Sequence, residues 1–289
     1  MVKLPVIIYN RRTKDDVLVD AIQLRASIEQ QARVEMQQNS TVIRPIVLFQ
    51  AQPKGKENAA TFEKLRDELM EIGIPKEQIA IKTSEINELK GVNLLAADCP
   101  IRYIITVNAL KEGWDCPFAY ILATLANRTS KVDVEQIVGR VLRLPYAHRH
   151  SQPLLNMAYV LTSSVDFRNT VENVVKGLNR AGFSDKEYRI GSDLPAPEPA
   201  PEPVQQTIDD IPVQPEGDTE EFVGFNTDDV RERLRTGEQE TQTGVSSPVA
   251  EMAQQAEAQG AAFEQEMQDA EDRGIPLMGG SDLRKVYEM

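Results

Sequence analysis

The sequence has 289 residues, enough for one sizeable α/β domain with further segments, and its formal net charge is −13. The acidic excess is uneven, because residues 1–192 have 26 Lys+Arg against 22 Asp+Glu, whereas residues 193–289 have 6 against 23. The first part is therefore compatible with local binding of a polyanion. The sequence shows no apolar run of membrane-spanning length and no signal peptide, and two cysteines are typical of a reduced protein, so we expect a cytoplasmic location.

Six short apolar segments within the first 192 residues predict β-strands. They are rich in β-branched residues, as buried strands of a parallel sheet are, and segments with helical periodicity separate them. This alternation predicts an α/β fold, with a parallel sheet that is covered by helices on both faces. The predicted strands are Val6–Tyr9, Ile43–Gln50, Ile79–Lys82, Tyr103–Val107, Tyr120–Leu125 and Met157–Thr162.

Four helices are predicted between these strands, over about residues 14–38, 59–72, from 133 onward and 166–181. Thr13 is expected to be the N-cap of the first helix, with Asp16 three residues further on. Apolar residues in the first two helices fall on one face of each and predict buried positions: Leu18, Ala21, Ile28, Ala32, Phe62, Leu65 and Leu69.

The composition changes at Leu194. Seven prolines follow within residues 195–215, and acidic, Gln- and Thr-rich sequence follows them. Such sequence cannot bury a core, so residues 193–247 are predicted to be a disordered acidic linker. Residues 248–289 are predicted to hold a fraying or partner-dependent helix, with Met252, Ala256, Phe263 and Met267 on one face and Gly260 interrupting it.

The loop after the fourth predicted strand has the first pattern that indicates chemistry. It reads Thr106-Val-Asn-Ala-Leu-Lys-Glu-Gly-Trp-Asp-Cys-Pro117 and starts at the carboxyl end of a strand, where ligands bind in open α/β sheets. Gly113 permits a tight turn, and the Asp115 carboxylate can accept two hydroxyl hydrogen bonds, as from a ribose. An ordinary strand-to-helix turn with an Asp cap explains this loop equally well when it is taken alone.

A second pattern, Gln136-Ile-Val-Gly-Arg-Val-Leu-Arg143, follows some 20 residues later. On a helix, Gln136, Arg140 and Arg143 share one face, while Val134, Ile137, Val138 and Val141 form the face that packs on the sheet. Two guanidinium groups one turn apart suit a polyphosphate, since their fork geometry matches phosphate oxygens. Alone, this pattern is also that of an amphipathic helix with a solvated basic face.

Together, in this order and spacing, the two patterns resemble motifs V and VI of the C-terminal RecA-like domain of superfamily 2 (DEAD/DEAH-like) helicases. Residues 110–115 resemble motif V, and residues 136–143 fit the QxxGRxxR form of motif VI. Residues 44–50 resemble the weaker motif IV. The sequence Glu-Gly-Trp-Asp at residues 112–115, together with residues 155–163 and 166–168, resembles the restriction (Res) subunit of type III restriction enzymes. The resemblance covers about residues 1–192.

The resemblance implies a domain division and residue roles. Residues 1–40 would be a leading strand and helix at an inter-domain junction, and residues 41–192 the RecA-like domain. It implies that Asp115, with Glu112 and Gly113, contacts the nucleotide, that Arg140 and Arg143 reach the ATP phosphates, and that Gln136 couples ATP to nucleic acid. Residues Val107, Asn108 and Lys111 would lie along the nucleic-acid backbone, which implies little sequence specificity.

The phosphate-binding half of such a motor is not found in the sequence. There is no GxxxxGK[ST] and no DExx box, so Mg²⁺ and the ATP phosphate loop are expected on a missing N-terminal RecA-like domain, and the chain alone is expected to be inactive. Neither cysteine has metal-ligand spacing, and the pair His148 and His150 is expected to be solvated, so no metal site is predicted.

Two functions are chiefly compatible with these patterns, and an unrelated nucleotide-binding α/β domain is a third, less favoured alternative. The first is the C-terminal half of an ATP-dependent DNA helicase or translocase, with a modification methyltransferase subunit as a further expected partner. The second is a non-catalytic nucleic-acid-binding or scaffold module that has kept the fold. The patterns do not distinguish DNA from RNA.

Overall fold

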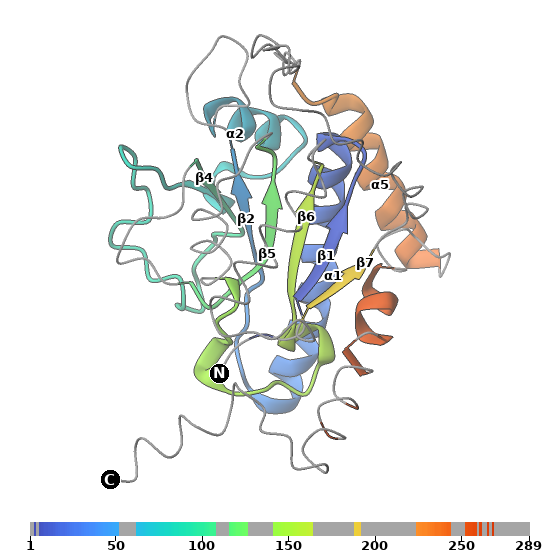
Figure 1. The fold of residues 1–289 in the computed structure, drawn as a ribbon. Coiled ribbons are helices and arrows are strands. Elements are labelled where there is room, and N and C mark those ends of the chain that lie inside the picture. The colour runs from blue at the N-terminus through green and yellow to red at the C-terminus, as the bar shows by residue number, and fades with distance from the viewer. Residues whose placement is uncertain are drawn as a thin grey trace, which may run out of the picture.

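The computed structural model describes residues 3, 6–51, 62–107, 116–126, 141–163, 188–191, 224–243, 252–258, 260, 261, 265 and 268. Within these residues seven strands form one sheet (Figure 1). They are β1 (Val6–Asn10), β2 (Ile46–Gln50), β3 (Ile79–Ile81), β4 (Tyr103–Thr106), β5 (Ala119–Thr124), β6 (Ala158–Thr162) and β7 (Tyr188–Gly191). The first six agree with the six predicted strands to within a few residues, and β7 was not predicted.

The sheet has the order β3-β4-β2-β5-β6-β1-β7, and every pair of neighbouring strands is parallel. The predicted parallel α/β sheet is thereby confirmed. The centre is continuous in register, since Leu48 pairs with both Ile104 and Leu122. Because all strands run the same way, their carboxyl ends form one edge of the sheet and their amino ends the other.

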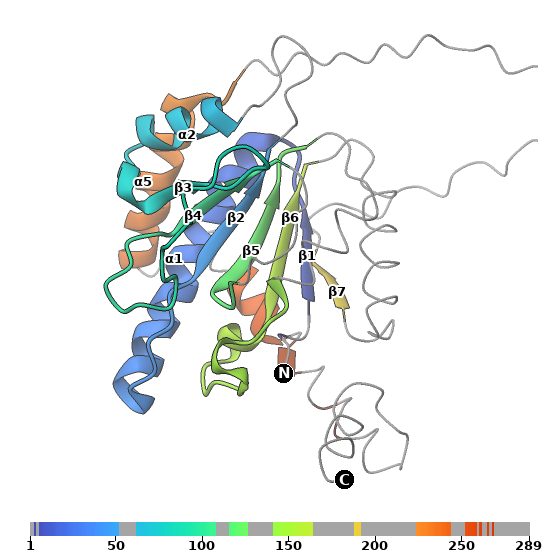
Figure 2. The same cartoon turned by 90° about the vertical axis from the view of Figure 1, so that its left-hand side faces the viewer.

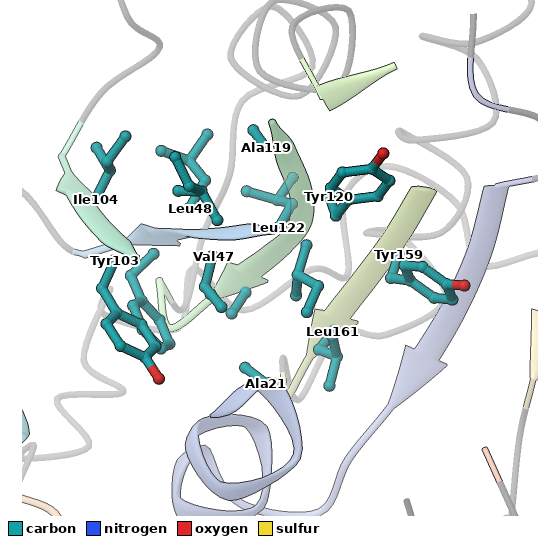
Figure 3. Close-up of a cluster of buried hydrophobic side chains, with 14 of the residues drawn as sticks. Ala21, Val47, Leu48, Tyr103, Ile104, Ala119, Tyr120, Leu122, Tyr159 and Leu161 are labelled. Carbon is teal, nitrogen blue, oxygen red and sulfur yellow. The ribbon is translucent and has the colours of Figure 1, made fainter. Parts of the chain in front are cut away.

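Side chains on both faces of the sheet are buried. In Figure 3, Val47, Tyr103 and Leu161 lie on the side of the helix that carries Ala21, whereas Leu48 and Ile104 lie on the opposite side. All of them are essentially inaccessible to solvent. Burial on both faces accounts for the nearly continuous apolar runs of the strands, which carry few outward-facing polar residues.

The longest helix, α1 (Lys14–Asn39), runs along one face of the sheet (Figure 2). The predicted capping box is present, because Thr13 Oγ1 accepts the Asp16 amide at 3.1 Å and the Asp16 carboxylate accepts the Thr13 amide at 3.0 Å. The helix ends at Ser40, whose backbone is left-handed with φ 54° and whose N–H donates to Met36 O. The apolar face predicted for this helix is buried.

The second helix, α2 (Phe62–Glu71), packs beside β4, with its predicted apolar residues buried. Three short 3₁₀ helices connect other elements: η1 (Lys76–Gln78), η2 (Pro145–Ala147) and η3 (Pro153–Asn156). Arg44, in the segment that resembles motif IV, has a structural role: its guanidinium donates to the carbonyls of Leu94, Ala96 and Ala97, and so holds the excursion between β3 and β4.

A further helix, α5 (Thr227–Thr243), lies inside the range predicted to be a disordered linker. That prediction is wrong for residues 227–243. Asn226 caps the helix by accepting the Asp229 amide at 3.2 Å, and Asp228 and Asp229 occupy its first turn, where acidic residues are favoured. In Figure 2, α5 lies on the same side of the sheet as α1 and α2.

Tertiary contacts explain why α5 forms in such polar sequence. Val230 is fully buried and Phe225 nearly so. Arg233 forms an ion pair with Asp16 at 2.8 Å, and its carbonyl accepts from the Gln23 side chain on α1. The apolar residues of α5 are few, but Val230 is part of the buried core and Leu234 packs against that core, so packing outweighs the composition.

The predicted helix near the end of the sequence is described in part. Residues 252–258 are helical, and Met252 and Ala256, which were predicted to share one face of the helix, are buried within this chain. The Tyr9 hydroxyl donates to Met252 O at 3.0 Å, which joins this segment to β1. Gly260 is itself helical, and a Cβ there would lie 3.1 Å from Met157 Sδ, so glycine permits a close approach to the Met157 side chain, directly before β6.

Candidate functional site

The segment that resembles motif V begins at the carboxyl end of β4. Thr106 is fully buried, and its carbonyl accepts the Ala51 amide at 2.8 Å. Val107 is half-buried and packs against the core, so its side chain has a structural contact in addition to the nucleic-acid role expected for it. The other residues expected to act in this loop lie outside the described residues: Asn108, Lys111, Glu112, Gly113 and Asp115.

The chain is described again from Cys116, directly after Asp115. Cys116 is fully buried, and its carbonyl accepts the Ala119 amide at 3.0 Å in a turn that leads into β5. The segment between residues 107 and 116 therefore connects the carboxyl edge of the sheet with its amino edge. The expected ribose-contacting residue, Asp115, is tied by its peptide bond to this buried turn.

The segment that resembles motif VI is described only at its end. Val141 is the last helical residue there; it is buried, as is Leu142, whereas Arg143 is exposed. The predicted burial of Val141 and exposure of Arg143 are confirmed, but Arg143 comes two residues after the end of the helix and does not lie on its predicted basic face. Gln136 and Arg140 lie outside the described residues, so their expected roles stay predictions.

Lys3 joins the ends of the two segments. Its ammonium group donates to Pro117 O at 2.8 Å, to Ala119 O at 2.7 Å and to Val141 O at 2.7 Å. The side chain is fully buried. Lysines are almost never fully buried unless their charge is paired, so a lysine is expected at the surface. No local pattern in the sequence predicts that Lys3 is buried. The two motif segments therefore meet at the amino end of β5.

An aromatic ring completes the surroundings of Lys3. The ammonium lies 4.3 Å from the centroid of the Tyr120 ring, and the Tyr120 hydroxyl donates to Leu155 O. Burial raises the pKa of Tyr120 well above its ordinary value, so the phenol stays neutral over the physiological range. The ring therefore contributes its π face and not a negative charge.

The residues that follow Arg143 pack against the end of α1. Glu35 accepts the amides of Ser151 and Gln152 at 3.0 and 3.2 Å. Burial of Glu35 opposes ionisation, but hydrogen bonds from Ser151, Asn39 and Gln152 outweigh it and lower the pKa below its ordinary value. The carboxylate thus fixes the loop that leads from Arg143 to β6.

The expected solvated pair of histidines is found only in part. His148 is exposed, but His150 is buried and its Nδ1 lies 3.6 Å from Glu35 Oε1. Burial lowers the pKa of His150, and His148 lowers it further, against the opposing effect of Glu35. The expectation is therefore wrong for His150, whose neighbour in space, Glu35, is far away in sequence. In the part of the chain that the structure describes, no cluster of three or more His, Cys, Asp or Glu residues could hold a metal ion.

None of the described helices is both long enough and apolar enough to cross a bilayer. No family model and no curated protein matches the sequence. Among solved structures, the chain is similar to the C-terminal domain of S. cerevisiae Dbp5 bound to Gle1 and IP6, with a TM-score of 0.37 and 15% identity, over 66% of this chain and 90% of that one.

Two restriction enzymes are also similar in structure. One is the type ISP restriction-modification enzyme LlaBIII bound to DNA, with a TM-score of 0.38 and 14% identity, over 66% of this chain and 16% of that one. The other, described as an HsdR subunit of a type I restriction enzyme from Vibrio vulnificus, has a TM-score of 0.33 and 16% identity, over 66% and 36%. At these TM-scores the similarities carry no argument about function, which has to come from the residues of this chain.

Proposed function

We propose that the chain is the C-terminal RecA-like half of an ATP-dependent DNA helicase or translocase, of the kind found in type III restriction enzymes. The observation that supports it best is the junction at Lys3. Two segments with the order and spacing of motifs V and VI have their ends joined by one ammonium group, with Arg143 exposed beside it. If residues 136–143 were only an amphipathic helix with a solvated basic face, there would be no reason for the end of that helix to be connected to the turn before β5.

In this proposal the residues act on a nucleotide that is bound between two domains. ATP supplies the phosphoryl group that is transferred to water. Asp115, with Glu112 and Gly113, contacts the ribose, and Arg140 and Arg143 stabilise the phosphate charge. The exposed side chain of Arg143 fits a contact that is made across an interface. Gln136 couples this site to DNA held along Val107, Asn108 and Lys111.

The proposed motor needs a second RecA-like domain. That domain would bring the phosphate-binding loop and the carboxylate that holds Mg²⁺, because neither motif occurs in these 289 residues. The proposal includes contacts to the DNA backbone and not to base edges, so binding should weaken with salt and depend little on sequence. A methyltransferase subunit is the further partner that restriction activity would require.

The test uses a motor reconstituted with an N-terminal RecA-like domain. Arg140→Ala and Arg143→Ala should each melt within a few degrees of the parent, since exposed substitutions shift stability by about 0.5 kcal/mol or less. DNA-stimulated ATP hydrolysis should fall by on the order of 10³-fold, as for other arginine fingers. Lysine at either position should not restore activity, because an ammonium group cannot make the bidentate contact.

Arg149→Ala is the matched control, because Arg149 is also exposed and lies in the following loop outside both motif segments. It should hydrolyse ATP like the parent. Gln136→Ala should keep more basal hydrolysis but lose its stimulation by DNA. If both arginine variants hydrolyse ATP normally, the nucleotide assignment is wrong. A motor that binds DNA without hydrolysing ATP would favour the non-catalytic binding module.

A further inference from the structure

We infer that Lys3 is a positioning residue, which fixes the end of the motif V segment against the end of the motif VI helix. This inference rests on the proposed function, because it gives Lys3 a role in aligning the expected nucleotide contacts. It concerns a residue outside every motif. Its basis is the set of contacts around the Lys3 side chain and backbone.

The ammonium group has three N–H donors and no acceptor, and each donor has a carbonyl partner. Two partners, Pro117 O and Ala119 O, lie in and just after the turn that follows Cys116, and the third is Val141 O. The Lys3 backbone N–H also donates, to Leu142 O. One residue thus makes four hydrogen bonds that connect two segments distant in sequence.

The position of the ammonium also suits the helix end. Val141 is the last helical residue, and carbonyls in the last turn of a helix lack partners within the helix. A cation at this end is favoured by the helix dipole. The Tyr120 ring, 4.3 Å from the ammonium, adds further stabilisation of the buried charge. These contacts explain how a lysine can be fully buried here.

The consequence for the site follows from the short distance along the chain. Asp115 is two residues before Pro117, and Arg143 is two residues after Val141. A group that fixes Pro117 relative to Val141 therefore restricts where both expected contacts can lie. Reacting groups tolerate little displacement, since a shift of about 1 Å can cost on the order of 10²-fold in rate. Lys3 would act through this alignment and without touching the nucleotide.

The test uses the full chain and its only tryptophan, Trp114, which lies within the motif V segment. Quenching of Trp114 fluorescence by iodide reports access to this segment without nucleotide. Lys3→Met keeps the length of the side chain but removes its charge and donors, so we expect the quenching constant to rise severalfold. The change in Trp114 emission on titration with ATP should show an apparent Kd at least about tenfold weaker than in the parent.

Two further variants separate positioning from general stability. Ile28→Ala removes a fully buried side chain of α1 that makes none of the Lys3 contacts, so it should lower the melting temperature while leaving quenching and apparent Kd within about twofold of the parent. Lys3→Arg keeps the charge and so should fold even where Lys3→Met does not. Its planar fork cannot direct donors to three carbonyls around one point, so intermediate quenching is expected.

The outcomes distinguish this inference from the proposed function. A parent chain whose Trp114 emission does not respond to ATP would contradict the proposed nucleotide site, while the quenching comparison would still test Lys3. The inference is overturned if Lys3→Arg, and also Lys3→Met where it folds, have the same Trp114 quenching constant and the same apparent Kd for ATP as the parent. It is also overturned if Ile28→Ala changes both readouts as much as Lys3→Met does.

Discussion

Glu68 on α2 is expected to make docking of α5 depend on pH. Its Oε1 accepts the Phe225 amide at 3.2 Å, and its side chain is almost completely buried. Burial, together with the negative charges of Asp15 and Glu71, raises the pKa of Glu68 from its ordinary value of 4.5 to about 7, against the opposing effects of Phe225 N–H and Lys64. Glu68→Gln replaces the carboxyl group with a neutral amide that can still accept the Phe225 hydrogen bond.

The direction of the effect follows from proton linkage. The folded state, with a pKa of about 7, binds the proton more tightly than the unfolded state at 4.5. The contribution of Glu68 to stability is therefore greatest below pH 4.5, is lost as the pH rises to 7, and stays lost above it. At about 1.4 kcal/mol per pKa unit, the loss amounts to roughly 3 kcal/mol.

The comparison is made by urea unfolding between pH 5 and pH 8.5, with hydrogen exchange of residues 224–236 at each pH. Glu68→Gln should be more stable than the parent by up to roughly 3 kcal/mol at pH 8, and the two should converge toward pH 5. Asp67→Asn, at an exposed position on the same helix, is the control and should show no such convergence. Parallel pH profiles for parent and Glu68→Gln would refute the reasoning.

Three further predictions follow from the fold and the sequence. Glu35→Ala should cost about 2–4 kcal/mol in urea unfolding at pH 7, because two amides lose their acceptor. Because the pKa of Glu35 is lowered from 4.5 in the folded state, the part of this contribution that comes from ionisation should decline as the pH falls below 4.5 and be lost as the pH falls through the lower folded pKa. Limited proteolysis should cut first within residues 193–223 and leave α5 attached to the core; early cuts within residues 227–243 would contradict its docking. The isolated chain should release no phosphate from ATP above background in a malachite-green assay, with or without single-stranded DNA, and robust turnover would refute the need for a partner domain.

The strands that lie inside the sheet could be predicted, because burial on both faces leaves a continuous apolar run in each. The β7 strand could not, since Tyr188–Gly191 reads Tyr-Arg-Ile-Gly and pairs only at an edge, with β1. The α5 helix was missed for a related reason. Its surroundings are acidic and rich in proline, and its burial depends on α1 and α2, which are distant in sequence.

The candidate site was predictable to the extent that its residues follow a helical period. The burial of Val141 follows from that spacing, whereas Arg143, also exposed as expected, lies beyond the end of the helix. Lys3 and Glu35 do not, because a charged residue is expected at the surface until its partners are known. Their partners, at Val141 and Ser151, are brought together only by the tertiary fold.

The place of β1 in the sheet has a consequence for folding. This strand comes first in the sequence but lies between β6 and β7, and Val6 pairs with both Ala158 and Tyr188. At about 5–20 residues per second, its neighbours leave the ribosome on the order of ten seconds later. Contacts between such distant segments form slowly, because the intervening chain loses entropy before it gains any pairing. The apolar surfaces of β1 and α1 are therefore where we expect a nascent chain to need protection from aggregation.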